Sequence, residues 1–397
     1  MNKVVVAYSG GLDTSYCVKY LIHERNLDVH TILVNTGGFD SDELEEVKKR
    51  ALELGSTSHV NKTITEEFYE KAIKFLIYGN VLKNNTYPLS VSAERIFQAL
   101  EVISYAKEVG ADYIAHGSTG AGNDQIRFDV IFQTLAPEIE ILTPIRDQKL
   151  SRQEEVEYLK KHGVGYEWEK AQYSINKGIW GTSIGGSETL TSHQTLPSYA
   201  YPNQLQKEGE ERVVLRFEKG ELVAINEEPN SPVANIQKLE KLAADFAVGR
   251  DVHVGDTIIG IKGRVGFEAA APLIILKAHH LLEKHVLSKW QQYWKEQLGN
   301  WYGMLLHEGN YLDPVMRNIE VFLEDSQKNV SGDVMVMLQP YRFSMIGIDS
   351  PYDLMKSDFG QYGETNKAWT ADDVKGFIKI YGNANKIYHA TNTLEND

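Results

Sequence analysis

The chain has one cysteine and no long apolar run among its 397 residues. A single cysteine, Cys17, excludes a disulfide framework and any zinc site built from cysteines. No apolar segment approaches the roughly 20 residues that a membrane-spanning helix requires. The first strand begins directly after Met-Asn-Lys. We therefore expect no signal peptide, no membrane partner and a cytoplasmic location.

Positive charge is also scarce, because 41 Lys and Arg residues face 55 Asp and Glu residues, for a net charge of −14. Proteins whose main partner is nucleic acid need clustered Lys and Arg, so this composition argues against such a partner. ATP remains possible, since backbone amides and a metal can hold its phosphates locally. The histidines form no H-E-x-x-H motif, and we predict no metal site made by the protein's own side chains.

A glycine-rich loop directly follows the first apolar run, which covers residues 4–7. The loop contains Gly10 and Gly11, and a helix is expected to begin just after it. Such a strand, turn and helix direct backbone N–H groups at one point, which favours an anion. No lysine follows the glycines, so this is not a Walker loop. It resembles the S-G-G-x-D-[ST]-[ST] loop of ATP pyrophosphatases, which release the β- and γ-phosphates together.

The first 165 residues alternate strand and helix patterns, which predicts an α/β fold with a doubly wound parallel sheet. We expect further strands at 30–34 and 112–116 and helices at about 40–54 and 93–109. Ligands in such sheets bind beyond the carboxyl ends of the strands, where both glycine turns would meet. The predicted domains are residues 1–165 for ATP binding, 166–368 for a second domain, and 369–397 for a C-terminal helix and tail.

The second domain is expected to be mixed α+β. Strand patterns occur at 212–217, 221–225 and 334–338, and amphipathic helical stretches at about 236–247 and 273–298. Apolar residues after Trp369 predict a terminal helix.

A second unusual run extends from His116 to Phe128, with its glycines spaced G-x-x-G-x-G. That spacing differs from the dinucleotide-binding pattern G-x-G-x-x-G. Its glycines expose backbone amides, and its polar residues offer donors and acceptors suited to amino and carboxylate groups. Taken alone, the run could equally be a helix start that Asn123 or Asp124 caps, with Arg127 in a surface ion pair.

Together the two motifs resemble argininosuccinate synthetase, and the resemblance covers essentially the whole chain. It implies an adenine nucleotide alpha hydrolase-like first domain and a reaction of arginine biosynthesis in two halves. The ureido oxygen of citrulline attacks the α-phosphorus of ATP, which gives citrullyl-AMP and pyrophosphate. The amine of aspartate then displaces AMP to form argininosuccinate. The resemblance also implies Mg²⁺ with the nucleotide and a homotetramer.

The resemblance assigns roles to individual positions. Those matched to ATP are Ala7, Tyr8, Ser9, Gly10, Gly11, Leu12, Asp13, Thr14, Ser15, Val34 and Gly117. Those matched to aspartate are Thr119, Asn123 and Asp124. Those matched to citrulline are Tyr87, Ser92, Asn123, Arg127, Ser174 and Ser183. The catalytic candidates are Asp124 and Arg95. We expect Arg95 to contact an anionic group and Asp124 to lie near the amine of aspartate.

Two acceptor positions depart from the family pattern. Gly255 stands where the family has a glutamate, and Phe267 stands where it has a tyrosine. Both family side chains belong to the citrulline site, so the amino-acid end of the acceptor is open to question. Asp256 could compensate if a bulge turned its side chain inward. Alternatively, the acceptor is an N-acylated citrulline, whose uncharged nitrogen needs no carboxylate. We expect plain citrulline, because most of the other acceptor positions match the family.

Two other functions are possible for this sequence. The first is a different pyrophosphate-loop synthetase, either amide-forming or tRNA-thiolating. Thiolation generally uses several cysteines and a basic face, and amide formation from glutamine would need a nucleophile that Cys17 does not supply. The second is a nucleotide sensor without turnover, which would need only the first loop.

Overall fold

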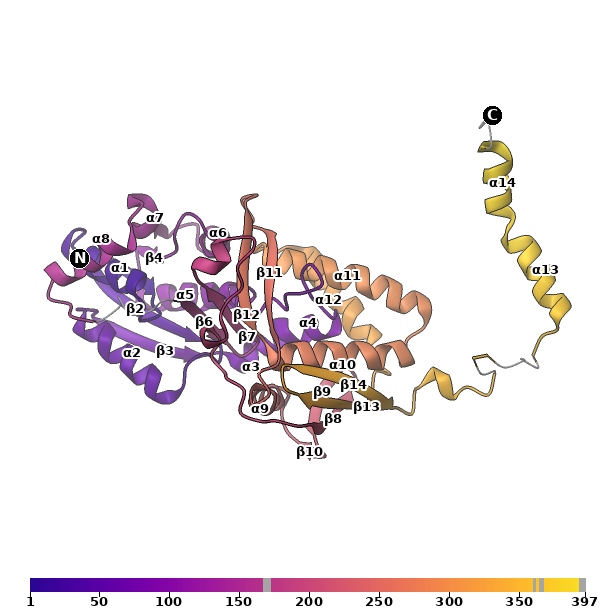
Figure 1. Ribbon diagram of the computed structural model, residues 1–397. Helices are drawn as coiled ribbons and strands as arrows, with labels where there is room; N and C mark the ends of the chain where they lie inside the picture. Colours follow the sequence, from indigo (N-terminus) through magenta and orange to yellow (C-terminus); the bar gives the residue numbers. More distant parts are fainter. Residues whose placement is uncertain (167–172, 360–361, 364–367, 393–397) are drawn as a thin grey trace. The chain divides into compact units, whose positions relative to one another are not determined.

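The structure is a computed structural model that describes residues 1–166, 173–359, 362–363 and 368–392 (Figure 1). The chain forms two compact units, Met1–Pro351 and Tyr352–Asp397. The predicted domain 1–165 and residues 166–351 of the second predicted domain fall within the first unit, whereas residues 352–368 belong to the second. The predicted boundary at 165 adjoins residues 167–172, which lie outside the described residues, as does the end of the predicted tail, 393–397. The domain boundaries therefore stay predictions.

A five-stranded parallel sheet forms the N-terminal part, in the order β3-β2-β1-β4-β5. Its strands are β1 (Lys3–Ala7), β2 (Asp28–Asn35), β3 (Ser58–Thr63), β4 (Tyr113–Ala115) and β5 (Glu140–Leu142). Alternate residues of β1 enter different cores, with Val4 and Val6 on one face and Val5 on the other. Burial on both faces explains the continuous apolar run, and the predicted α/β class is confirmed.

Helices cover both faces of this sheet. They are α1 (Leu12–His23), α2 (Ser41–Glu53), α3 (Thr65–Phe68), α4 (Lys74–Tyr78), α5 (Glu94–Val109), α6 (Asp124–Leu135), α7 (Pro144–Gln148) and α8 (Arg152–Lys161), with a π-helical turn η1 (Tyr69–Ile73) between α3 and α4. Asp40 and Glu43 form a capping box before α2, as their spacing predicts. Helix α5 ends at Gly110, whose φ of +65° is left-handed and suits glycine.

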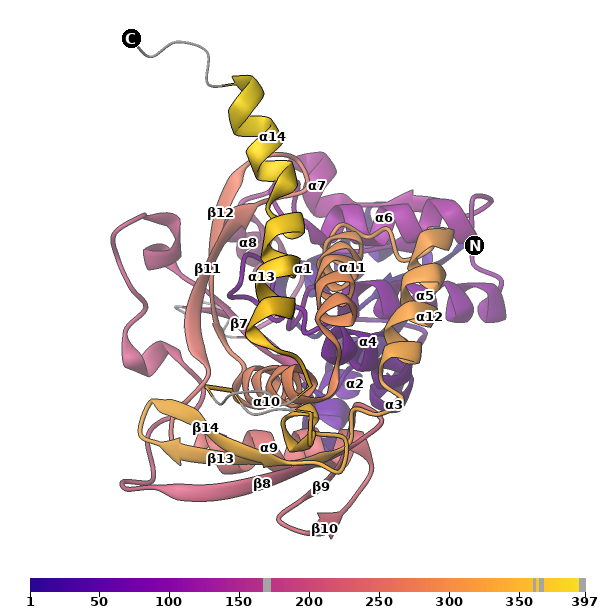
Figure 2. The same cartoon turned by 90° about the vertical axis from the view of Figure 1, so that its right-hand side faces the viewer.

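Two antiparallel sheets follow. One has the order β10-β9-β8-β13-β14 and the other β11-β12-β7-β6. The strands are β6 (Ser174–Gly178), β7 (Gly181–Gly185), β8 (Glu211–Glu218), β9 (Glu221–Ile225), β10 (Glu228–Pro229), β11 (Arg250–Asp256), β12 (Lys262–Glu268), β13 (Gly332–Gln339) and β14 (Arg342–Asp349). The helices are α9 (Pro232–Ala244), α10 (Ala270–Val286), α11 (Lys289–His307) and α12 (Pro314–Ser326), with 3₁₀ turns η2 (Ser187–Leu190) and η3 (Ser198–Ala200). Figure 2 shows α10 beside β13 and β14, which it contacts.

The prediction of one amphipathic stretch over 273–298 is wrong at its centre. Leu287 is extended, and Ser288 begins a new helix, α11, with a capping box to Gln291. The apolar pattern continues through this point because both helices bury one face. The capping box therefore starts a new helix, although the helical spacing of apolar residues continues across the boundary.

The turn after β2 brings the parallel sheet against the β6–β7 hairpin. The amide of Ile179 donates to the carbonyl of Thr36 at 2.8 Å. A Cβ on Gly38 would overlap the carbonyl of Lys177. Only glycine allows the two backbone segments to come this close. The β6–β7 hairpin therefore lies beside the ends of the parallel strands, where it forms part of the wall of the candidate site.

The second unit contains η4 (Leu354–Lys356), α13 (Ala371–Tyr381) and α14 (Asn383–Asn392). Thr370 and Asp373 form a capping box at the start of α13, so the predicted terminal helix is confirmed. The apolar residues Val374, Phe377, Ile378 and Tyr381 are exposed. Within the described residues, no helix is long and apolar enough to cross a membrane.

Candidate active site

The loop after β1 leaves its backbone donors available. Gly11 caps α1 without any side-chain hydrogen bond, so the first N–H groups of the helix remain for a ligand. Gly10 has a φ of +78°, and its carbonyl accepts a hydrogen bond from Arg50 at 2.7 Å. The hydroxyls of Ser9 and Thr14 lie 3.3 Å apart. The residues from Ala7 to Ser15 are all predicted to contact ATP. Among them, Tyr8, Leu12 and Ser15 are buried.

The second glycine turn packs directly on the first. A Cβ placed on Gly117 would lie 3.2 Å from backbone atoms of Asp13 and Thr14. These turns follow β1 and β4, the neighbouring strands at which the order of the parallel sheet reverses. Ligands of open α/β sheets bind at this point. His116 fixes the start of the turn, because its Nε2 pairs with Asp129 at 2.8 Å and its Nδ1 accepts from the amide of Ser118.

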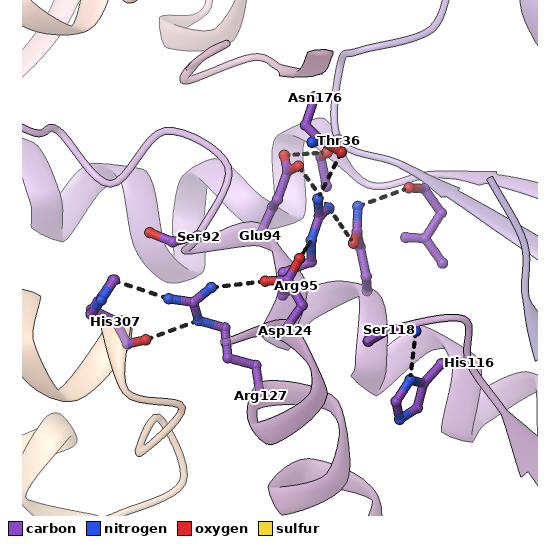
Figure 3. A network of polar contacts seen from close by, with 12 residues as sticks. Thr36, Ser92, Glu94, Arg95, His116, Ser118, Asp124, Arg127, Asn176 and His307 are labelled. Carbon is purple, nitrogen blue, oxygen red and sulfur yellow. Dashed lines mark hydrogen bonds and ion pairs between the residues drawn. The ribbon is translucent and has the colours of Figure 1, made fainter. Parts of the chain in front are cut away.

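A charged network lies where α5 and α6 begin (Figure 3). Asp124 accepts hydrogen bonds from Arg95 Nε at 3.0 Å and from Arg127 Nη1 at 2.8 Å. Burial would raise the pKa of Asp124, but the two guanidinium charges outweigh it and lower the pKa to about 2. The carboxylate therefore stays ionised at neutral pH, and its side chain remains 40% exposed toward solvent.

Further contacts fix the two arginines. Arg95 also contacts Glu94 at 3.2 Å, and Thr36 donates to the same carboxyl group. Burial raises the pKa of Glu94 to about 7 although Arg95 opposes this rise. Arg127 is held by α11, since its Nε and Nη2 donate to the carbonyl and Nδ1 of His307 at 2.9 and 3.0 Å. Burial and the charge of Arg127 lower the pKa of His307 to about 2, so this imidazole is a neutral acceptor.

A cleft of about 220 Å³ opens between this network and the sheet that contains β11 and β12. Its walls include the predicted residues Tyr87, Ser92, Arg95, Asn123, Asp124, Arg127, Ser183, Gly255 and Asp256. The structure thus brings together side chains that lie up to 169 positions apart in the sequence, from Tyr87 to Asp256. Asn123 also joins the two walls, because its Oδ1 accepts from the amide of Ile258 at 2.9 Å.

Other predicted residues lie outside this cleft. Thr119 is exposed on the second glycine turn, and Ser174 is exposed on β6. Val34 is buried at the end of β2, where Gln98 donates to its carbonyl. Phe267 is fully buried, with its ring 5.4 Å from that of Tyr87. Phe267 packs against Tyr87 and is not among the residues that line the cleft.

Four cleft residues have no local signal in the sequence. Asn176 of β6 accepts from Arg95, and His307 holds Arg127. His253 stacks on Tyr87, with ring centroids 5.1 Å apart. Arg264 donates to the carbonyls of Glu188 and Gln194. His253 lies two residues before Gly255, but the two share a face only where both belong to one regular strand, and the sequence does not establish that.

No group of three metal-ligating side chains occurs in the described part of the chain. Cys17 is a free cysteine of α1 and is fully buried in the hydrophobic core.

A parallel sheet, a glycine-rich loop without lysine after its first strand and a charged cleft thus lie within one compact unit. Residues 3–165 match the argininosuccinate synthase N-terminal HUP domain, and residues 173–388 match the C-terminal domain of the same family. The chain belongs to the argininosuccinate synthase family. This confirms the predicted activity, ATP-dependent ligation of citrulline and aspartate in arginine biosynthesis.

Full-length relatives agree with that assignment. The chain is 36% identical to argininosuccinate synthase of Dictyoglomus turgidum over 390 residues, which cover 98% of this chain and 97% of the relative. It is 36% identical to the enzyme of Methanocaldococcus jannaschii over 387 residues, or 97% of each chain. It is 35% identical to that of Xanthomonas axonopodis pv. citri over 401 residues, which cover 98% of this chain and 95% of the relative.

Proposed function

We propose that the loop after β1 binds the phosphates of ATP and that the 220 Å³ cleft binds the ureido acceptor and aspartate. The observation that carries this proposal is the packing of Gly117 on Asp13 and Thr14. That contact joins the phosphate loop to the turn that leads into the charged cleft. The α-phosphorus of a bound ATP is then within reach of an acceptor in the cleft.

Adenylylation needs positioning and charge stabilisation rather than a protein nucleophile. The free N–H groups of α1 orient the β- and γ-phosphates as pyrophosphate leaves. Arg95, which is held by Asp124 and Glu94, stabilises negative charge that develops during this transfer. Arg127 and Ser92 position the acceptor. The ureido oxygen forms a bond to the α-phosphorus, and the bond to the β-phosphate oxygen breaks.

In the second half-reaction we assign Asp124 to the amine of aspartate, with Thr119 and Asn123 beside it. An ionised carboxylate between two arginines keeps lone pairs for an ammonium group because its side chain is partly exposed. The ammonium group first releases a proton to solvent, and the free amine then forms a bond to the ureido carbon. AMP leaves with the former ureido oxygen, and the attacking nitrogen gives up a second proton to solvent. Mg²⁺ would accompany ATP through phosphate oxygens, since the described residues offer no cluster of their own.

Pyrophosphate and AMP release test this proposal. We expect pyrophosphate and AMP to accumulate together only when ATP, a citrulline-type acceptor and aspartate are all present. Omission of the acceptor should abolish both products. Omission of aspartate should leave only the exchange of labelled pyrophosphate into ATP. Release that needs no acceptor would contradict the proposal and would favour another pyrophosphate-loop enzyme.

We also propose a homotetramer in which the C-terminal helices take part. The support is the exposed apolar set on α13, which includes Phe377 and Ile378 at 63% and 60% exposure. A chain that ends after Trp369 should form smaller species in light scattering, while the full chain should be a tetramer. A truncated chain that stays tetrameric would exclude this role of the helices. The cytoplasmic location stays a prediction.

A further inference from the structure

At Gly255, the wall of the cleft is formed by a glycine with a histidine packed against it. His253 and Gly255 share the buried face of β11, whereas Val254 and Asp256 are exposed. The pairing of β11 with β12 is regular from Arg250 to Asp256, so no bulge turns Asp256 inward. A Cβ built on Gly255 would lie 2.7 Å from Nε2 of His253. The imidazole therefore occupies the space that a side chain at position 255 would need.

With Asp124 assigned to the amine of aspartate, the described residues of the cleft leave no carboxylate for a positively charged acceptor nitrogen. Among the described residues that line it, Asp124 and Asp256 are the carboxylates. Asp124 is held by two arginines, and Asp256 pairs with Lys262 at 2.6 Å on the exposed side of the hairpin. An ammonium group near Gly255 would lose its hydration without gaining a counter-ion, which is costly.

The side chains that a Cβ on Gly255 would meet are those of His253 and Asn84. Burial and the charge of Lys83 lower the pKa of His253 to about 4, so its ring is uncharged at neutral pH. Lys83 is half-buried and forms no ion pair with any described residue. His253 is 6% exposed, and its Nδ1 has no hydrogen-bond partner. A neutral imidazole suits an amide, which offers one N–H donor and one carbonyl acceptor.

We infer that the acceptor is a citrulline whose α-nitrogen carries an acyl group. This inference rests on the proposed function, because it concerns the substrate of the same site. An amide nitrogen is uncharged and needs no carboxylate, and the amide can exchange hydrogen bonds with the neutral imidazole that packs on Gly255. The chemistry is unchanged: the ureido oxygen attacks the α-phosphorus, pyrophosphate leaves, and the aspartate amine displaces AMP. The acyl group stays on the product.

The test compares kcat/KM for citrulline, N-acetylcitrulline and N-succinylcitrulline at saturating ATP and aspartate. We expect the wild type to prefer one acyl derivative over citrulline by roughly ten- to a hundredfold, the effect of one charge-assisted hydrogen bond. The two derivatives distinguish a neutral acyl group from an acidic one. Preference for plain citrulline would overturn the inference and leave the proposed function intact. Failure of all three acceptors to release pyrophosphate would overturn both.

A double variant and a control variant test whether His253 and Gly255 determine the choice of acceptor. His253→Ala combined with Gly255→Glu makes room for a carboxylate, and this double variant should reverse the order in favour of citrulline. Val254→Thr on the exposed face of the same strand is the control and should keep the wild-type order. Calorimetric binding of each acceptor without ATP gives a second readout if turnover is lost. A folded double variant with an unchanged order of binding would contradict the assignment to Gly255.

Discussion

Asp124→Ala is expected to lower the formation of argininosuccinate, or of its acyl derivative, by about a hundredfold or more. The carboxylate accepts hydrogen bonds from both Arg95 and Arg127, and loss of one partner from a hydrogen-bonded charge pair typically costs about 2–5 kcal/mol. The first half-reaction should suffer less. Arg127 keeps its two hydrogen bonds to His307, so the acceptor end of the cleft stays in place.

The measurement separates the half-reactions. Exchange of labelled pyrophosphate into ATP without aspartate reports adenylylation, and product formation with aspartate reports the whole reaction. Asp124→Asn is the matched control, because it keeps the shape and removes the charge. Equal loss of both activities in a folded Asp124→Ala protein would show that Asp124 mainly positions the arginines and does not receive the amine.

Gly117→Ala is expected to lower kcat/KM for ATP by roughly ten- to a hundredfold. The added Cβ would lie 3.2 Å from three atoms of Asp13 and Thr14, two of them backbone atoms, so the phosphate loop must shift. Overpacking of this kind typically costs about 1–3 kcal/mol, which corresponds to that range of rate. The KM of the acceptor should change less, since Gly117 does not line the cleft.

Gly122→Ala is the control for this substitution. Gly122 lies in the same glycine-rich run, and a Cβ there would meet nothing within 4 Å. Its kinetics for ATP should match those of the wild type. If both alanine variants lose activity equally, flexibility of the run matters more than its contact with the phosphate loop.

Much of the first domain could be predicted because its signals are local. The capping box at Asp40, the glycine stop at Gly110 and the apolar strand at Val4 each lie within a few residues. The break at Ser288 also had a local signal, the capping box to Gln291. It was hidden because apolar residues continue at helical spacing on both sides.

The cleft could be predicted only in part. The resemblance supplied Arg95, Asp124 and Arg127, which follow recognisable motifs. Contacts such as that of Arg127 with His307 join residues 180 positions apart, and no sequence pattern reports them. The position of His253 against Gly255 depends on which face of β11 is buried and on a regular pairing with β12. Neither property can be derived from the departure at Gly255 alone.

The most direct test of the account follows the ureido oxygen. The enzyme should be supplied with ATP, aspartate and an acceptor whose ureido oxygen is ¹⁸O, and the products analysed by mass spectrometry. If that oxygen attacks the α-phosphorus and AMP then leaves with it, each AMP should carry one ¹⁸O and the pyrophosphate none. ADP and phosphate as the stoichiometric products, or label in the pyrophosphate, would contradict the account.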